Sequence, residues 1–161
     1  MKPAYLSDLT QLALVMLRRG GVSETLNRLK GELRTSPEPF VWASLGLRGA
    51  DDLLPPEIRS AWLFALKADV WSGLHHHPNS VQHMMVVSGQ GHSRIDGVQG
   101  DLAAFDPDAS WDEQWCVIDR AVPHEFFPAG EDMIVMSFHT AGPEELLEVS
   151  DSGNSRRYRT S

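Results

Sequence analysis

The chain has 161 residues, of which 42% are hydrophobic, and this is enough for one domain with a buried core. Its formal net charge of −8 argues against nucleic acid as a partner, because phosphate contacts need clustered Lys and Arg. No segment reaches the roughly 20 apolar residues that cross a bilayer, and no signal sequence is recognisable. The single cysteine, Cys116, cannot form an intramolecular disulfide. We therefore expect a cytoplasmic protein with neither a nucleic-acid nor a membrane partner.

Residues 1–36 are predicted to form a helical segment. Apolar residues recur at spacings of three and four from Tyr5 to Leu17, which places them on one face of a helix. Gly20 and Gly21 are expected to end this helix, and a second helix is expected to begin after Ser23. The apolar face needs a surface to cover, so we expect the helices to pack on an open face of the domain or to mediate a homodimer.

After Phe40 the hydrophobic pattern changes to a period of two, which is typical of strands. Gly and Pro separate the segments, and many short strands with such turns indicate an all-β sandwich or barrel over residues 37–148. Residues 149–161 are rich in Ser and Arg and are predicted to be a flexible C-terminal tail. The strand candidates are residues 40–45, 60–71, 82–88, 92–96, 101–105, 115–119, 124–127 and 133–139.

All seven histidines lie between positions 75 and 139. Because residues i and i+2 of a strand face the same side, His75 and His77 can point at one interior position while His76 points away. His124 could bring a third ring nitrogen from a later strand if the sheet closes on itself. Imidazole is the commonest metal ligand in proteins, so this pattern suggests a metal site. Two alternatives stay open: three adjacent histidines can be surface residues, and His139 can be a hydrogen-bonded core residue.

Residues 73–91 read Gly-Leu-His-His-His-Pro-Asn-Ser-Val-Gln-His-Met-Met-Val-Val-Ser-Gly-Gln-Gly and resemble the first motif of the cupin superfamily. His75 and His77 match its two histidines, Gln82 stands where a Glu is expected, and Gly89 matches the closing glycine. Residues 119–124 are similar to the second motif only at His124. The resemblance covers residues 40–145 and implies a single jelly-roll barrel. It also implies a divalent transition metal held by His75, His77 and His124, with Gln82 as a weak ligand or a positioning residue.

The missing carboxylate makes the site resemble the three-histidine cupins, which include thiol dioxygenases and diketone-cleaving dioxygenases. The segment Ser137-Phe-His139 is similar to thiol dioxygenases, but Ala141 stands where that family has a Tyr. The resemblance implies an oxygen-dependent oxidoreductase acting on a small organic substrate, with Fe(II) favoured and Ni, Mn or Zn possible. A metal-assisted isomerase or lyase and a non-catalytic binding module are the alternatives.

Two polar residues are candidates for a catalytic role, Gln82 and Arg94. Arg94 could bind a substrate carboxylate through two hydrogen bonds, although the sequence favours a surface role for it. The substrate pocket would be the barrel interior, and its candidate lining residues are also those that any barrel core requires. These residues are Trp62, Phe64, Met84, Val86, Phe126, Met136 and Phe138.

Overall fold

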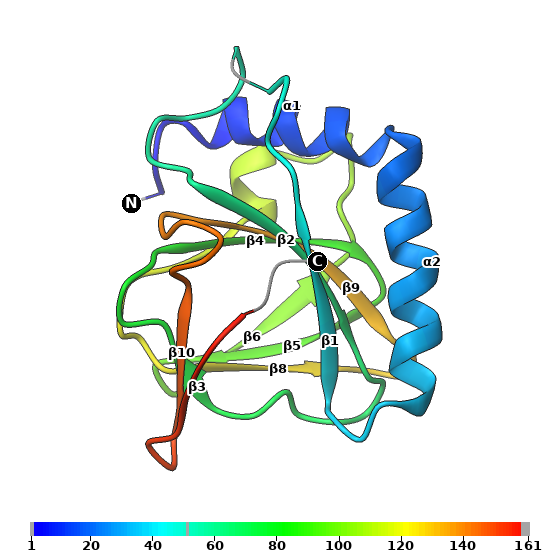
Figure 1. The fold of residues 1–161 in the computed structure, drawn as a ribbon, viewed down its shortest axis with the longest axis vertical. Helices are drawn as coiled ribbons and strands as arrows, with labels where there is room; N and C mark the ends of the chain where they lie inside the picture. Colours follow the sequence, from blue (N-terminus) through cyan, green and yellow to red (C-terminus); the bar gives the residue numbers. More distant parts are fainter. Residues whose placement is uncertain (1, 51, 159–161) are drawn as a thin grey trace.

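A computed structural model describes residues 2–50 and 52–158 of the chain and contains two α-helices followed by β-strands (Figure 1). The helices are α1 (Leu6–Leu17) and α2 (Gly20–Thr35), and a short 3₁₀ helix, η1, spans Trp111–Gln114. The strands are β1 (Phe40–Leu45), β2 (Ser60–Leu66), β3 (His75–His76), β4 (Gln82–Ser88), β5 (Gln90–Ile95), β6 (Val98–Ala103), β7 (Cys116–Ile118), β8 (His124–Pro128), β9 (Met133–His139), β10 (Leu147–Ser150) and β11 (Ser155–Arg157).

The helical segment is confirmed, but the boundary between its two helices differs from the prediction. Gly20 begins α2 instead of ending α1, and the two helices are separated only by residues 18 and 19. Arg19 has an extended backbone, with φ −78° and ψ 136°, and this one residue turns the chain between the helices. Glycine is therefore not needed as a left-handed cap at this junction.

The strands form two antiparallel sheets, one with the order β1-β2-β9-β4-β7 and one with the order β11-β10-β3-β8-β5-β6. The predicted closed barrel is therefore wrong, because no strand described in the structure belongs to both sheets and the architecture is a sandwich. The chain between the edge strands β6 and β7 runs through η1 and loops, so the ladder of hydrogen bonds does not continue from one sheet to the other. The strand predicted over residues 60–71 also stops earlier, at Leu66.

The five-stranded sheet is buried on both of its faces. Its outer face carries Leu63, Met136 and Phe138, which pack in one apolar cluster with the helices. Its inner face carries Trp62 and Met84, which pack in a second cluster against the other sheet. Figure 1 shows α1 above the sheets and α2 along one side. The prediction that the helices cover a face of the domain is confirmed, whereas the homodimer stays a prediction.

The end of the chain is ordered up to residue 158, so the predicted flexible tail is wrong for this part. β10 and β11 form a hairpin at the edge of the six-stranded sheet, with Glu148 opposite Arg156. Tyr158 is buried against the rings of Trp42, Trp62 and Phe64. This aromatic packing offsets the entropy of ordering a polar segment. Residues 159–161 lie outside the described part of the chain.

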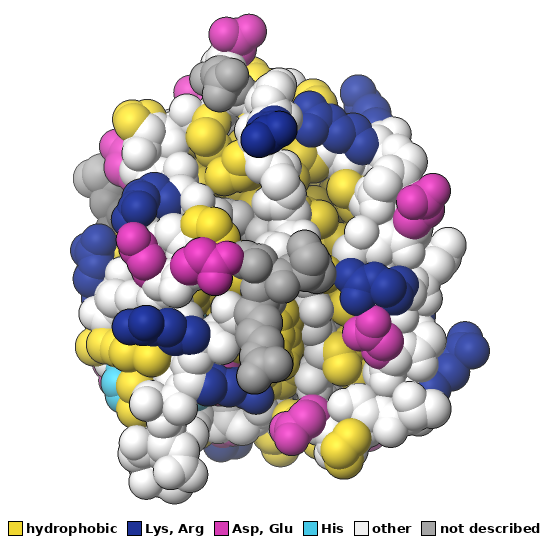
Figure 2. Space-filling view, viewed as in Figure 1, with side chains coloured by type: hydrophobic (Ala, Val, Ile, Leu, Met, Phe, Trp, Pro, Cys, Tyr) yellow, Lys and Arg dark blue, Asp and Glu magenta, His cyan; other side chains and the backbone are white. Residues whose placement is uncertain are grey.

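Neither of the described helices is long and apolar enough to span a membrane. On the face shown in Figure 2, Lys and Arg are interspersed with Asp and Glu and do not gather in one patch. Histidine side chains are almost absent from this face, because most of them lie inside the sandwich.

Candidate metal centre

Two strands of the sandwich, β3 and β8, and the residue that follows β3 bring His75, His77 and His124 together. His75 lies in β3 directly opposite His124 in β8, and His77 follows two residues after His75 on the same side. One ring nitrogen from each of the three side chains lies within 4.8 Å of the other two. All three residues are buried, with His124 only 1% exposed. The sequence-predicted trio therefore converges on one interior point, although the sandwich is not a closed barrel.

Hydrogen bonds to backbone carbonyls fix which nitrogen of each ring is free. Nδ1 of His75 donates to the carbonyl oxygen of Gly73 at 2.8 Å, and Nδ1 of His124 donates to that of Val122 at 2.9 Å. Nδ1 of His77 donates to the carbonyl of the first residue of β10 at 2.9 Å. A carbonyl oxygen can only accept, so Nδ1 carries the proton and Nε2 keeps its lone pair. This is the arrangement in which imidazole binds a metal ion through Nε2.

Burial lowers the pKa of two of these imidazoles, those of His77 and His124. Burial and the neighbouring His75 lower the pKa of His77 to about 4. Burial, followed by His75 and His77, lowers the pKa of His124 well below its ordinary value. Nε2 of His124 is also buried without a hydrogen-bond partner among the described residues. A neutral, desolvated and unpartnered nitrogen costs free energy that a bound cation would recover.

His139 adjoins this trio but is not equipped to bind a metal. Its ring centroid lies 5.2 Å from that of His77. Its Nδ1 lies 3.0 Å from the hydroxyl oxygen of Ser80, and its Nε2 lies 3.0 Å from that of Ser137. Both nitrogens are therefore engaged, which confirms the alternative that His139 is a hydrogen-bonded core residue.

Gln82 lies beside the histidines at the start of β4. Its side chain is buried, and its Oε1 has no hydrogen-bond partner among the described residues. Gln82, His75 and His77 line the same cavity, which has a volume of about 30 Å³. An amide oxygen in this state can bind a cation weakly or accept a hydrogen bond from a bound water. The space holds an ion with one or two waters, so only a small ligand fits without rearrangement.

The apolar wall of the cavity agrees only partly with the predicted pocket. Phe64, Met84 and Phe126 line it, as predicted. Met136 and Phe138 are wrong, because they face the helices on the other side of the sheet. β9 is buried on both faces, so its alternation alone does not show which residues face inward. The residues that complete the lining are Phe40, Leu66, Ser72, Val135 and Tyr158.

Arg94 is not brought to the cluster. It lies on β5, where its neighbour Ser93 is buried and the Arg94 side chain is 44% exposed. Its guanidinium forms an ion pair with Glu125 at 2.7 Å and lies 4.4 Å from the ring centre of Trp71. The predicted role in binding a substrate carboxylate is therefore not supported by its position, because the strand alternation turns Arg94 away from the cavity.

Two residues at the end of the chain belong to the site and were missed by sequence reasoning. Oε2 of Glu148 lies 3.9 Å from Nε2 of His75, and the buried hydroxyl of Tyr158 donates to the same carboxylate oxygen. Tyr158 also lines the cavity. The sequence places Glu148 at the last position of the predicted barrel and Tyr158 in the predicted tail, where an aromatic residue in a polar stretch is the one signal of burial.

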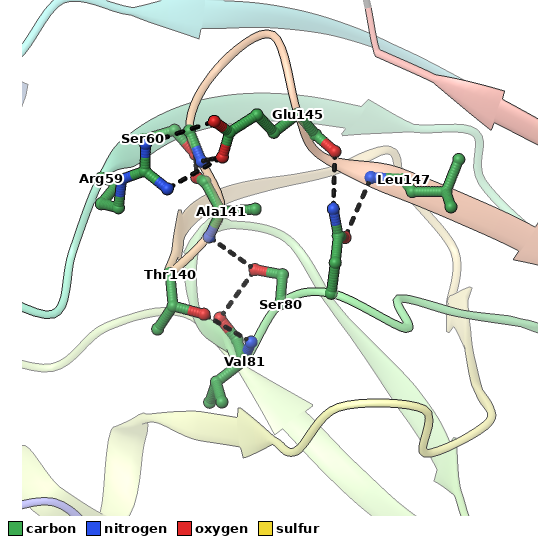
Figure 3. Close-up of polar contacts among 10 residues, drawn as sticks. Arg59, Ser60, Ser80, Val81, Thr140, Ala141, Glu145 and Leu147 are labelled. Atoms are coloured by element: carbon green, nitrogen blue, oxygen red, sulfur yellow. Dashed lines mark hydrogen bonds and ion pairs between the residues drawn. The ribbon is translucent and has the colours of Figure 1, made fainter.

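The segment that carries Glu148 is tied to the loop that follows His77 (Figure 3). Side-chain and backbone groups of the loop over residues 79–81 bond to residues 140–147, and an ion pair with Arg59 holds Glu145 at 2.8 Å. These contacts fix the start of β10, whose first carbonyl accepts the bond from His77. The individual bonds are Asn79 Nδ2 to Glu145 O at 2.6 Å, Leu147 N to Asn79 Oδ1 at 3.2 Å, Ala141 N to Ser80 Oγ at 3.2 Å and Val81 N to Thr140 Oγ1 at 2.9 Å.

Comparison with known proteins finds structural similarity without sequence relatives. No family model matches the sequence, and no curated protein matches it. The DMSP lyase DddQ from Ruegeria pomeroyi is 15% identical with a TM-score of 0.54, over 73% of this chain and 54% of the lyase. Procruciferin, an 11S globulin from Brassica napus, is 12% identical with a TM-score of 0.53, over 72% of this chain and 29% of the globulin. An uncharacterised Klebsiella pneumoniae protein with a double-stranded β-helix domain is 16% identical with a TM-score of 0.49, over 69% of this chain and 84% of that one.

The chain spans about half the length of the DMSP lyase and less than a third of the globulin, so the similarity concerns the sandwich. At these identities it establishes the fold and leaves activity open. The two antiparallel sheets of this chain, with histidines from β3 and β8 turned inward, agree with this structural similarity. The chain thus shares the fold of a double-sheet sandwich with the DMSP lyase and the globulin.

Proposed function

We propose that this chain is a metalloprotein in which His75, His77 and His124 hold one divalent transition metal ion. The observation that carries the proposal is the hydrogen-bonding pattern that the three rings share, each with Nδ1 bonded to a backbone carbonyl and Nε2 left for a ligand. The buried and unpartnered Nε2 of His124 adds to it. Imidazole suits Fe(II), Ni and Zn, and Fe(II) remains our first choice, with Mn also possible.

The reaction class that we propose first is an oxygen-dependent oxidation of a small organic substrate. Three neutral imidazoles leave the full +2 charge on an ion and leave coordination positions for a substrate and dioxygen. The small apolar cavity would exclude water around them, and the free oxygen of Gln82 would orient a ligand through a hydrogen bond. An anionic substrate with two donor atoms suits such a centre.

A metal-assisted lyase or isomerase is the second candidate, and the pair Glu148 and Tyr158 favours it. These reactions move a proton, and a carboxylate that accepts from a tyrosine hydroxyl beside the histidines can take part in such a transfer. The similarity to the fold of a DMSP lyase points in the same direction. Non-catalytic binding of a small molecule is the remaining alternative.

Metal analysis of the purified protein tests the proposal. We expect about one divalent ion per chain in the wild type, a loss of that ion in His124→Ala, and no loss in His92→Ala, which removes a histidine with an exposed side chain. Oxygen uptake by the Fe(II)-loaded protein with thiols and diketones would support oxidation. Turnover without oxygen would support the lyase or isomerase. Equal metal content in the wild type and His124→Ala would refute the site.

A further inference from the structure

The second sheet places a carboxylate beside the three histidines from the far end of the chain. In the register of β10 with β3, Ser150 is opposite His75 and Val149 is opposite His76. Glu148 therefore faces the same side as Ser150 and His75, toward the interior. Its side chain is 9% exposed, and Oε2 lies 3.9 Å from Nε2 of His75.

Glu148 is held in this position by two partners. Arg156 Nε donates to Oε1 at 3.0 Å, and the hydroxyl of Tyr158 donates to Oε2. Burial, and then the charge of Glu148, raises the pKa of Tyr158 well above its ordinary value, so this hydroxyl keeps its proton and acts as a donor. The guanidinium of Arg156 in turn lies 5.1 Å and 5.2 Å from the ring centres of Phe40 and Trp42. The carboxylate is thus oriented by two hydrogen bonds before any ligand arrives.

Both oxygens of this carboxylate retain capacity for another partner. A carboxylate has about four lone-pair positions, and the two bonds to Arg156 and Tyr158 use two of them. Donors bound to one ion at about 2.1 Å are separated by about 3 Å when adjacent and by about 4 Å when opposite. The 3.9 Å between Oε2 of Glu148 and Nε2 of His75 falls in this range. Among the described residues only the three histidine nitrogens all lie within 4.8 Å of one another, so Oε2 has to move closer to His77 and His124 to bind the same ion.

We propose that Glu148 completes the donor set of the metal centre and binds the ion through Oε2 together with His75, His77 and His124. This inference rests on the proposed metal site and extends it. From β4 the site receives the amide of Gln82, whereas the carboxylate comes from the C-terminal hairpin. A three-histidine, one-carboxylate centre carries less positive charge and accepts harder ions than a site of three imidazoles.

The chain contains a matched control for this residue. Glu125 is as buried as Glu148, at 8% and 7% exposure, and each forms an ion pair with one arginine. Glu125 pairs with Arg94 on the opposite side of the six-stranded sheet, away from the histidines. A change of Glu125 to Gln therefore removes a buried, paired carboxylate without removing a group that faces the proposed ion.

Titration of metal-free wild type, Glu148→Gln and Glu125→Gln with Mn(II) and with Zn(II) tests the inference. Manganese prefers carboxylate oxygen, whereas zinc is well served by imidazole. We expect Glu148→Gln to bind Mn(II) about 10- to 100-fold more weakly, with a smaller loss for Zn(II), and Glu125→Gln to match the wild type. Equal losses for both ions, or equal effects of the two variants, would overturn the role of Glu148.

A wild type that binds no metal and a Glu148→Gln variant that does not fold are distinguished from a Glu148 that is not a ligand. If the wild type binds neither ion, the proposed metal site itself is refuted, and the failure does not concern Glu148 alone. If Glu148→Gln does not fold, as judged by circular dichroism, the pair Glu148→Asp and Glu125→Asp replaces the first pair. The shortened carboxylate at position 148 should weaken Mn(II) binding relative to the shortened carboxylate at position 125, and equal affinities would contradict the proposal.

Discussion

Replacement of Tyr5 by Phe should measure how much the hydrogen bond between the start of α1 and β4 contributes to the free energy of unfolding. The hydroxyl of Tyr5 lies 2.7 Å from Nε2 of His83, a residue that is fully buried on the outer face of β4. Nδ1 of His83 donates to the carbonyl of Phe138 at 3.1 Å, so Nε2 must be the acceptor and Tyr5 the donor. Burial lowers the pKa of His83, which keeps this acceptor neutral. Phe at position 5 removes the donor and preserves the ring.

The magnitude follows from the burial of the acceptor. An unsatisfied buried nitrogen costs roughly 1–3 kcal/mol, and the upper half of this range applies because His83 is fully buried. For a domain of this size, a loss of about 2 kcal/mol lowers Tm by roughly 4–8 °C. We therefore expect Tyr5→Phe to reduce the free energy of unfolding by about 2 kcal/mol.

Urea denaturation and thermal unfolding of the wild type, Tyr5→Phe, His83→Leu and the double variant would give this quantity. In the His83→Leu background the buried acceptor no longer exists, so Tyr5→Phe should cost less than about 0.5 kcal/mol. The same loss in both backgrounds would refute the hydrogen bond as the cause. If Tyr5→Phe lowers the free energy of unfolding by less than about 0.5 kcal/mol in the wild-type background, water replaces the hydroxyl as the donor.

Two further predictions concern packing and pH. Gly91→Ala should destabilise the protein by about 3 kcal/mol in urea unfolding, because a Cβ there would meet the backbone of Phe127 and lie 2.9 Å from Cα of Pro128, and neither can move aside. Gly31→Ala should instead stabilise the protein by about 0.5–1 kcal/mol, because a Cβ at this position in α2 meets open space. A loss of stability in Gly31→Ala equal to that in Gly91→Ala would contradict the argument. The metal-free protein should lose stability as pH falls from about 6.5 toward 4, because the pKa of His77 is near 6.5 when unfolded and about 4 when folded. The unfolded state then binds more protons, so the contribution of His77, about 3 kcal/mol in total, is complete above pH 6.5. A free energy of unfolding that stays constant between pH 6.5 and about 4 in the presence of a chelator would refute this contribution of His77.

Much of the candidate site could be predicted from local sequence. The i, i+2 rule places His75 and His77 on one side of the chain, and this relation holds in the structure because it depends only on extended backbone. The bounds predicted for β4 and β9 agree with the structure, because alternation and flanking turns are local signals. The sequence predicts a helix end at Gly20, which is wrong because a single extended residue, Arg19, makes the turn between the helices.

Other parts depended on pairing between distant segments. The alternation of β9 identifies two sets of residues but not which set faces the cavity, since both faces of its sheet are buried. Arg94 was placed at the site although its strand turns it outward toward Glu125. Neither error could be corrected from local pattern, because each depends on which neighbouring layer covers a given face.

The sequence by itself determined that the chain has two amphipathic helices, a run of short strands and a histidine pair able to act together. These properties arise from periodicity and backbone geometry over a few residues. Only the tertiary structure decided that the sheets remain open and that His124 meets the pair. It also decided that Glu148, at the end of the predicted barrel, and Tyr158, in the predicted tail, lie beside the histidines. The physical reason is that burial of a polar chain end depends on partners more than 70 positions away, His75 among them, and no local pattern encodes such a contact.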